Sequence, residues 1–363
     1  SNLEKAKISN IQLGFLTFGF LYGNTAIMNA IYVVRRDSWL VVVQNLIFSL
    51  GIVTIYLFIS EFHPDKNLVE ILQYCFGRIA GSIIAFLYLF TFLHLGAMNL
   101  RNLGDFLTTV SFPETPMIII LLLILCVITY AVSSGLEVLG RISEVLVPFI
   151  PLAILFLSTS VITISDFSVF FPVLEGGYGR FLSETYGVVT FPYGDLITFL
   201  MIYPYLNKQK GKFKATYTGV ILVGTAFLII AVRNLVVLGP ELIENTTYVT
   251  EIIAKLIPGV SIEPIIDINL LIGGGLKISV FLYAVTKGVA QLSAIKDYRP
   301  LVPAFSVLTL VVSLWVFVND IEEMNFLRNS GNLYFVFPLH IAVPVIVLII
   351  SLVKRKKHKG NIN

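Results

Sequence analysis

Charge is what this sequence has least of, and the shortage narrows the class of protein at once. Only 13% of its 363 residues are charged, whereas 56% are hydrophobic. Soluble domains carry about a quarter charged residues and roughly 45–50% apolar ones. A soluble enzyme, a disordered protein and a nucleic-acid-binding protein are therefore disfavoured, and the small net charge of +3 does not indicate a nucleic-acid partner.

Cysteine and histidine are also scarce, which limits metal and redox chemistry. The two cysteines, Cys75 and Cys126, are too few for a disulfide framework or a cysteine-based zinc site. The four histidines contain no H-x-x-x-H or H-E-x-x-H spacing. We expect no metal, no cofactor and no catalytic residues. We also expect Cys126, which lies in an apolar run, to be a small core residue.

Long apolar runs, by contrast, fill most of the chain. A helix that crosses a bilayer needs about 20 mostly apolar residues. Ten stretches qualify, at residues 11–34, 38–60, 80–110, 116–132, 143–165, 185–205, 214–238, 265–290, 300–318 and 334–353. The sequence therefore predicts an all-α polytopic membrane protein with ten transmembrane helices, in which residues 1–363 form a single transmembrane domain.

Lysine and arginine are distributed unevenly between the loops, and this predicts the orientation. Basic loops stay on the cytoplasmic side of a membrane. When both termini are placed there, 16 basic residues fall in cytoplasmic segments and 5 in external ones. The other four, Arg101, Arg233, Lys277 and Lys287, lie within predicted spans. Arg233 and Lys287 lie toward span ends, so we expect them to snorkel to the surface.

Two spans carry helix-breaking residues near their middle. The first contains Gly19 and Gly23, and the sixth contains the string Thr190-Phe-Pro-Tyr-Gly-Asp195. Ten spans divide into two sets of five, about residues 11–165 and 185–353, so the first and sixth spans occupy corresponding positions. A matched pair of interrupted spans indicates a transporter-type binding site.

The two breaks supply the main candidates for binding a ligand. Irregular backbone is tolerated inside a membrane only where protein or a water-filled cavity satisfies its polar groups. The N–H groups at the start of a half-helix suit a carboxylate. We expect Pro192 at the first position of the second half of the sixth span. Asp195 then falls in the first turn, as a partner for an ammonium group. The candidates are Gly19, Tyr22, Gly23, Asn24, Thr25, Thr190, Phe191, Pro192, Tyr193, Gly194 and Asp195. The alternative is a glycine-rich packing face in the first span and a simple proline kink in the sixth.

The third span adds a polar face to the candidate site. Met98, Arg101 and Asp105 share one helical face, and Asn102 lies beside it. Because charged groups within a membrane usually face the protein interior, Met98, Arg101 and Asn102 are further candidates for ligand binding, and Asp105 for coupling. The alternative is a local pair between Arg101 and Asp105, four residues apart near the outer end.

Lys277 falls in the middle of the eighth span, after three glycines. A buried lysine needs a carboxylate, backbone carbonyls or deprotonation. Three interpretations remain open. In the first, Lys277 is a fixed charge that replaces the cation held by sodium-coupled transporters of this architecture. In the second, Lys277 titrates in proton coupling. In the third, Lys277 is a structural tether to carbonyls exposed by the break in the first span.

Short strings near the span boundaries share a further pattern. They are KISNIQLGFL at residues 7–16, Arg36-Asp-Ser-Trp39, Thr115-Pro116, Gly135-Leu-Glu-Val-Leu-Gly-Arg-Ile-Ser-Glu144, and Phe191-Pro-Tyr-Gly-Asp195 with Tyr203-Pro-Tyr205. In this order they resemble the B subunits of endospore germinant receptors, within the amino acid–polyamine–organocation superfamily. The first span departs from many permeases of that superfamily, because Gly19-Phe-Leu-Tyr-Gly23 replaces their G-S-G run.

The resemblance implies a fold and a role. The fold is a LeuT-type 5+5 inverted repeat with a pocket among the first, third, sixth and eighth spans. The role is to sense a nutrient, often an L-amino acid, in the spore inner membrane, together with a membrane-embedded A subunit and a C lipoprotein. A proton-coupled amino-acid permease of the same superfamily is the alternative. A structural or channel-forming subunit with a vestigial pocket is a third hypothesis.

Overall fold

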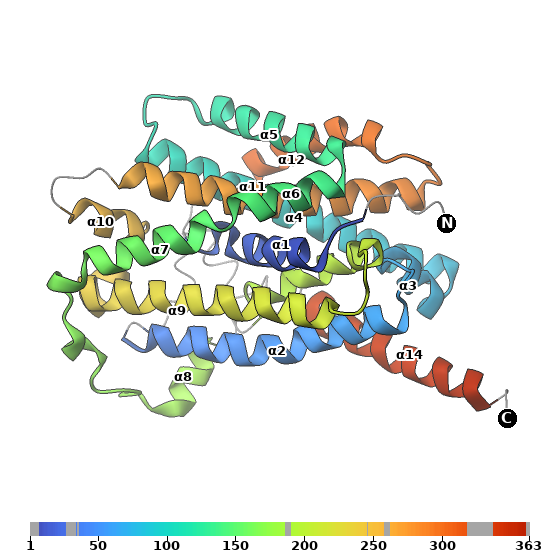
Figure 1. Ribbon diagram of the computed structural model, residues 1–363, viewed down its shortest axis with the longest axis horizontal. Coiled ribbons are helices and arrows are strands. Elements are labelled where there is room, and N and C mark those ends of the chain that lie inside the picture. The colour runs from blue at the N-terminus through green and yellow to red at the C-terminus, as the bar shows by residue number, and fades with distance from the viewer. Residues whose placement is uncertain are drawn as a thin grey trace.

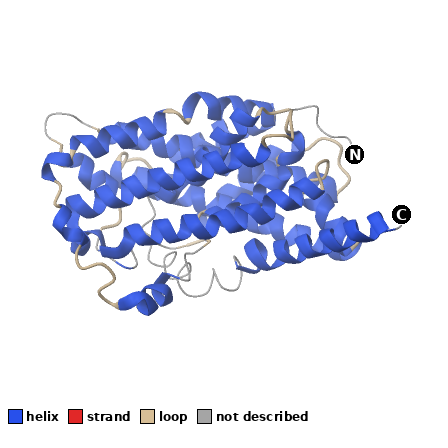
Figure 2. Cartoon of the chain, turned by 60° about the horizontal axis from the view of Figure 1, so that its bottom comes forward, coloured by secondary structure: helices blue, strands red, loops and turns tan. Residues whose placement is uncertain are grey.

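The fold is helical throughout the described part of the chain. The computed structural model describes residues 7–26, 34, 36–185, 190–244, 246–257, 262–317 and 337–360, without the side chains of residues 24, 26, 244 and 356–360. Within these ranges the only β-type pairing is one isolated parallel bridge between Ile8 and Leu206. The all-α fold predicted from the sequence is confirmed (Figure 2).

Seven helical segments in the described ranges are long and apolar enough to cross a membrane. They are α2 (Ser38–Phe62), α4 (Arg78–Val110), α5 (Met117–Ser134), α6 with α7 (Leu136–Leu146 and Phe149–Ser160), α9 (Lys212–Glu244), α11 (Glu263–Leu292), and Pro338–Arg355, most of which is α14 (Val343–Gly360). The other three expected spans correspond to shorter helical segments. These are α1 (Asn10–Tyr22), the 3₁₀ segments at Tyr193–Met201 and Tyr203–Tyr205, and α12 (Val302–Trp315).

α1 lies in the middle of the bundle, where it packs against α6, α9 and α11 (Figure 1). Large apolar side chains face outward on the surrounding helices, for example Tyr130 on α5 and Trp315 on α12. In a bilayer these side chains contact lipid rather than water. Cys126 is also exposed on α5, so its assignment to the core was wrong. An apolar run does not by itself distinguish a lipid-facing residue from a buried one.

Short helices lie between the longer ones, and local residues account for where they begin. α3 (Leu68–Phe76) begins at a capping box in which Asn67 and Glu70 each accept a hydrogen bond from the other's backbone N–H. α10 (Val249–Lys255) lies between α9 and α11. The fifth span divides into α6 and α7 next to Pro148, because proline commonly kinks a helix.

α3, the start of α9 and the end of α14 lie at one end of the bundle (Figure 1). The Asn10 side-chain amide donates to the carbonyl of Lys210 at 3.0 Å. The Lys354 ammonium donates to the carbonyl of Tyr74 at 2.6 Å. These contacts join the amino-terminal, 208–212, α3 and carboxy-terminal segments, which the loop charges place on one side of the membrane. α8 (Gly177–Thr185) and α10 lie toward the opposite end, called the outer end below (Figure 1).

Candidate ligand-binding site

The break in the first span lies at Gly23. α1 ends at Tyr22 because Gly23 has φ +29°, and a 3₁₀ turn, Gly23–Ala26, follows. A Cβ atom at Gly23 would lie 2.6 Å from the Cδ atom of Lys277. Glycine at this position therefore permits both the turn and the close approach of the Lys277 side chain to the backbone.

The sixth span is interrupted over most of its described length. Residues Tyr193–Met201 form a 3₁₀ helix, although 3₁₀ runs longer than 3–4 residues are uncommon. Pro192 caps this segment and so lies one position before the one we expected. The Gly194 N–H donates to the carbonyl of Thr190 at 2.7 Å, which closes the turn after the proline. Asp195 lies in the first turn of the segment.

An ion pair between Asp195 and Lys277 connects the two breaks. The Lys277 Nζ atom lies 2.9 Å from Asp195 Oδ2, and the two residues are 2% and 7% exposed. The ammonium also lies over the rings of Phe20 and Phe191, 5.6 and 5.8 Å from their centres. Lys277 therefore has the buried carboxylate partner that a buried lysine needs, and the three interpretations of its role stay predictions.

His340 is the site residue that sequence reasoning missed. It lies in a π-helical turn, Pro338–Ala342, at the start of the last span, and is 2% exposed. Its Nε2 atom is 3.9 Å from Asp195 Oδ1 and has no hydrogen-bond partner among the described residues. A Cβ atom at Gly194 would collide with the His340 ring, so this glycine permits the two segments to pack. A lone histidine in an apolar run was the available signal, and nothing local identified its partner.

Tyrosine hydroxyls hold the last span against the interrupted segment. The Tyr56 hydroxyl on α2 lies 3.2 Å from the carbonyl oxygen of Gly194 and 2.6 Å from that of His340. The Tyr88 hydroxyl on α4 donates to the carbonyl of Leu339. Because 3₁₀ and π turns leave some backbone carbonyls without regular α-helical partners, these hydroxyls supply the missing donors inside the bundle.

The third span contributes less than its polar face indicated. Arg101 Nε donates to Asp105 Oδ2 at 2.6 Å, which is the local pair named as the alternative. Met98 packs beside Phe317 in a small apolar cluster. In the first span, the Thr25 hydroxyl donates to the carbonyl of Leu21 at 3.0 Å. The Asn24 side chain lies outside the described part of the chain.

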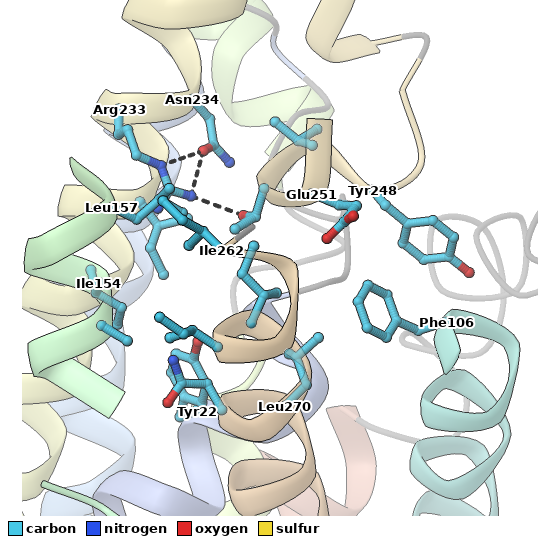
Figure 3. A pocket seen from close by; sticks show the side chains of 17 residues that line it. Tyr22, Phe106, Ile154, Leu157, Arg233, Asn234, Tyr248, Glu251, Ile262 and Leu270 are labelled. Carbon is cyan, nitrogen blue, oxygen red and sulfur yellow. Dashed lines mark hydrogen bonds between the residues drawn. The ribbon is translucent and has the colours of Figure 1, made fainter. Parts of the chain in front are cut away.

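Two basic residues expected to snorkel are buried instead. Arg233, 4% exposed, donates to Asn234 Oδ1 at 2.7 Å and to the Thr250 hydroxyl at 2.9 Å (Figure 3). Lys287 lies over the rings of Tyr205 and Tyr298, at 5.5 and 5.1 Å. Both expectations were wrong because the protein itself offers partners: Asn234 and Thr250 accept hydrogen bonds from Arg233, and two tyrosine rings face Lys287.

Two interrupted segments that meet at a buried ion pair inside a helical bundle define a membrane protein with a transporter fold. A Na⁺-coupled sialic acid symporter superposes with a TM-score of 0.71, covering 96% of this chain and 90% of that one, at 10% identity. MhsT in complex with L-phenylalanine superposes with a TM-score of 0.59, covering 96% and 99%, at 13% identity. At such identities the likeness establishes the LeuT-type fold alone.

The chain belongs to the family described as spore germination protein, which matches residues 7–321. Spore germination protein KB of Bacillus subtilis (strain 168) is 26% identical to it in an alignment of 371 positions, gaps included, that covers 98% of each chain. Spore germination protein YndE of the same strain is 22% identical in an alignment of 338 positions that covers 89% of each chain. The family predicted from the strings at the span boundaries is therefore confirmed.

Proposed function

We propose that this membrane protein is the B-type subunit of a nutrient germinant receptor that binds an L-amino acid near the membrane midplane, between the two interrupted segments. The Asp195–Lys277 pair is the observation that carries the proposal. It places an anion and a cation side by side in a buried position. Membership of the spore germination family supports the receptor role, and the transporter fold supports a small ligand.

The pair suits a zwitterion in particular. The ligand ammonium takes the place of Lys277 on Asp195, and its carboxylate accepts from the Lys277 ammonium. Every buried charge then keeps a partner of opposite sign, which avoids the large penalty of an unpaired buried ion. This exchange separates the 3₁₀ segment Tyr193–Met201 from α11, since the direct contact between Asp195 and Lys277 is lost. A ligand shifts a conformational equilibrium only through such a difference in contacts.

The signal passes to partner subunits. We propose an A-type membrane subunit and a C-type lipoprotein as these partners, in the spore inner membrane. Both termini of this chain then lie in the cytoplasm. The gathering of basic segments at one end of the bundle supports this orientation, because basic loops remain on the cytoplasmic side.

A proton-coupled amino-acid permease is the second candidate. It is favoured by the proximity of three ionisable side chains, Asp195, Lys277 and His340, which offers sites for a transported proton. MhsT, which has this fold, was solved in complex with the amino acid L-phenylalanine.

Reconstitution into liposomes separates the two candidates. Labelled amino acids are first screened for saturable binding to the purified protein. The ligand that binds is then supplied to sealed liposomes with and without an inward proton gradient. A receptor subunit binds the ligand at the central site and accumulates none, and Asp195→Asn abolishes that component of the binding. Sustained gradient-driven uptake contradicts the receptor and establishes the permease.

A further inference from the structure

A separate pocket lies at the outer end of the bundle (Figure 3). Side chains of α7, α9, α10 and α11 line it, together with Phe106 of α4. Tyr22, the last residue of α1, forms its inner end. Asn269 also lines the pocket and precedes Lys277 by eight residues in α11, a rise of about 12 Å along the helix. The pocket therefore lies outward of the Asp195–Lys277 pair.

Two buried polar side chains face this pocket. Glu251 is 3% exposed and Asn269 is 5% exposed. Oε2 of Glu251 has no hydrogen-bond partner among the described residues, while Oε1 lies 3.2 Å from the exposed ammonium of Lys255. Buried polar groups are almost always paired, so the unpaired Glu251 oxygen indicates a bound water or ligand.

The surroundings of Glu251 select the charge of that ligand. Phe106 and Tyr248 pack edge to face beside it, with ring centres 5.2 Å apart (Figure 3). A carboxylate flanked by aromatic rings suits an ammonium group, which gains a charge-assisted hydrogen bond and a cation–π contact. Arg233 donates to Thr250 and so holds α10 against α9, which keeps Glu251 over the pocket.

We propose that this pocket is an outer subsite for the primary ammonium group of a small ligand. Glu251 supplies the anion, Phe106 and Tyr248 supply the aromatic walls, and Asn269 supplies a hydrogen bond at the inner end. The ligand is a small amine or a small amino acid, because both carry the ammonium that Glu251 recognises. The subsite goes beyond the proposed function, since it is separate from Asp195 and Lys277 and does not require them.

Three matched probes test the subsite on the purified full-length chain. Ethylamine carries the ammonium alone, propionate carries the carboxylate alone, and L-alanine carries both. Binding is measured by equilibrium dialysis of the labelled compounds. We expect ethylamine and L-alanine to bind and propionate not to bind. Glu251→Gln lowers ethylamine affinity at least tenfold, and Asn269→Leu lowers it severalfold. Glu114→Gln, an exposed carboxylate in the turn after α4 and outside the pocket lining, leaves it within twofold.

Two further variants keep the proposal falsifiable. Asp195→Asn retains ethylamine binding, so a failure of the proposed central site is distinguishable from a failure of this one. Phe106→Leu keeps the carboxylate and weakens ethylamine binding by removing one aromatic wall, which covers the case in which Glu251→Gln does not fold. Ethylamine binding that is absent from the wild type, or unchanged in folded Glu251→Gln, overturns the subsite. Either result assigns the pocket to water alone.

Discussion

Lys277 and Asp195 depend on each other for burial, and this mutual dependence is testable. Lys277→Met leaves the Asp195 carboxylate buried without its ammonium partner. Removing one member of a buried pair costs about 3–5 kcal/mol, whereas replacing both members by hydrophobic residues of similar volume is often nearly neutral. We expect Lys277→Met to lower the unfolding midpoint in detergent, and Lys277→Met with Asp195→Leu to recover most of the loss. A double variant as unstable as Lys277→Met alone contradicts the pairing.

Gly23 and Gly194 are expected to be essential for ligand response rather than for insertion. A valine at Gly23 meets Lys277, and a valine at Gly194 meets the His340 ring. Either side chain displaces a member of the buried cluster, so ligand affinity falls at least tenfold while the protein remains in the membrane. Gly275→Val is the control, because a Cβ atom there has no neighbour within 4 Å. Unchanged affinity in both variants removes the breaks from the binding site.

Binding of ethylamine at the outer subsite is expected to depend on pH. Burial raises the pKa of Glu251 above its ordinary value, and Lys255 opposes this only in part, while the nearby carboxylates of Asp267 and Glu263 raise it further. Only the ionised carboxylate attracts an ammonium. The affinity is therefore full above the raised pKa and falls as pH decreases through it. Titration of ethylamine affinity against pH measures this, and Glu251→Gln should give a flat profile.

Sequence reasoning identified Asp195 and Lys277 singly but not as a pair. Intramembrane charge and adjacent glycines are local signals, visible in one sequence. The pairing of two residues on different spans depends on how those spans pack, and no local pattern encodes that. His340 was missed for the same reason, since its partners come from α2 and the interrupted sixth span.

Among the elements, α11 provides a matched pair of glycines. A Cβ atom at Gly273 would lie 2.8 Å from the Tyr22 ring and 3.0 Å from the backbone nitrogen of Gly23, whereas one at Gly275 meets nothing. We expect Gly273→Ala to lower the unfolding midpoint, because the backbone it meets cannot give way. Gly275→Ala should be neutral or stabilising by up to about 1 kcal/mol, from helix propensity. Equal effects would mean that α1 and α11 do not pack through Gly273.

Elements with strong local signals were predictable, and those shaped by neighbours were not. The capping box set the start of α3, and proline set the division between α6 and α7. The 3₁₀ segment Tyr193–Met201 and the π turn Pro338–Ala342 give no periodicity of their own. Tyr56 and Tyr88 stabilise them from outside the element, so the geometry follows from tertiary contacts.

At the scale of the whole molecule, the orientation in the membrane can be measured directly. In a background with Cys75→Ser and Cys126→Ser, the single cysteine of Lys210→Cys or of Arg180→Cys shows on which side of the membrane that position lies. We expect a membrane-impermeant thiol reagent to label Arg180→Cys in intact cells and Lys210→Cys only after permeabilisation. Labelling of both in intact cells contradicts the orientation inferred from the basic segments.

Apolar runs and paired breaks were enough to predict the fold class, and short strings were enough to predict the family. The number of membrane spans is harder to predict from the sequence. Seven described segments meet the length and hydropathy of a membrane helix, while the described parts of the first, sixth and ninth expected spans contain shorter helical segments. The division into repeats near residues 165 and 185 stays a prediction. Hydropathy indicates that a segment can cross a bilayer, but it does not indicate whether the backbone of that segment is helical throughout.

The contact of the Tyr56 hydroxyl with the carbonyl of His340 joins residues 284 positions apart. During synthesis, the early helices and the interrupted sixth span insert long before the last span emerges. Until then, the Tyr56 hydroxyl lacks its contact with the carbonyl of His340, and Gly194 lacks the His340 ring that packs against it. The contacts among Tyr56, Gly194 and His340 are therefore completed only after the segment that carries His340 has been inserted, and a nascent chain that ends before this segment cannot form them.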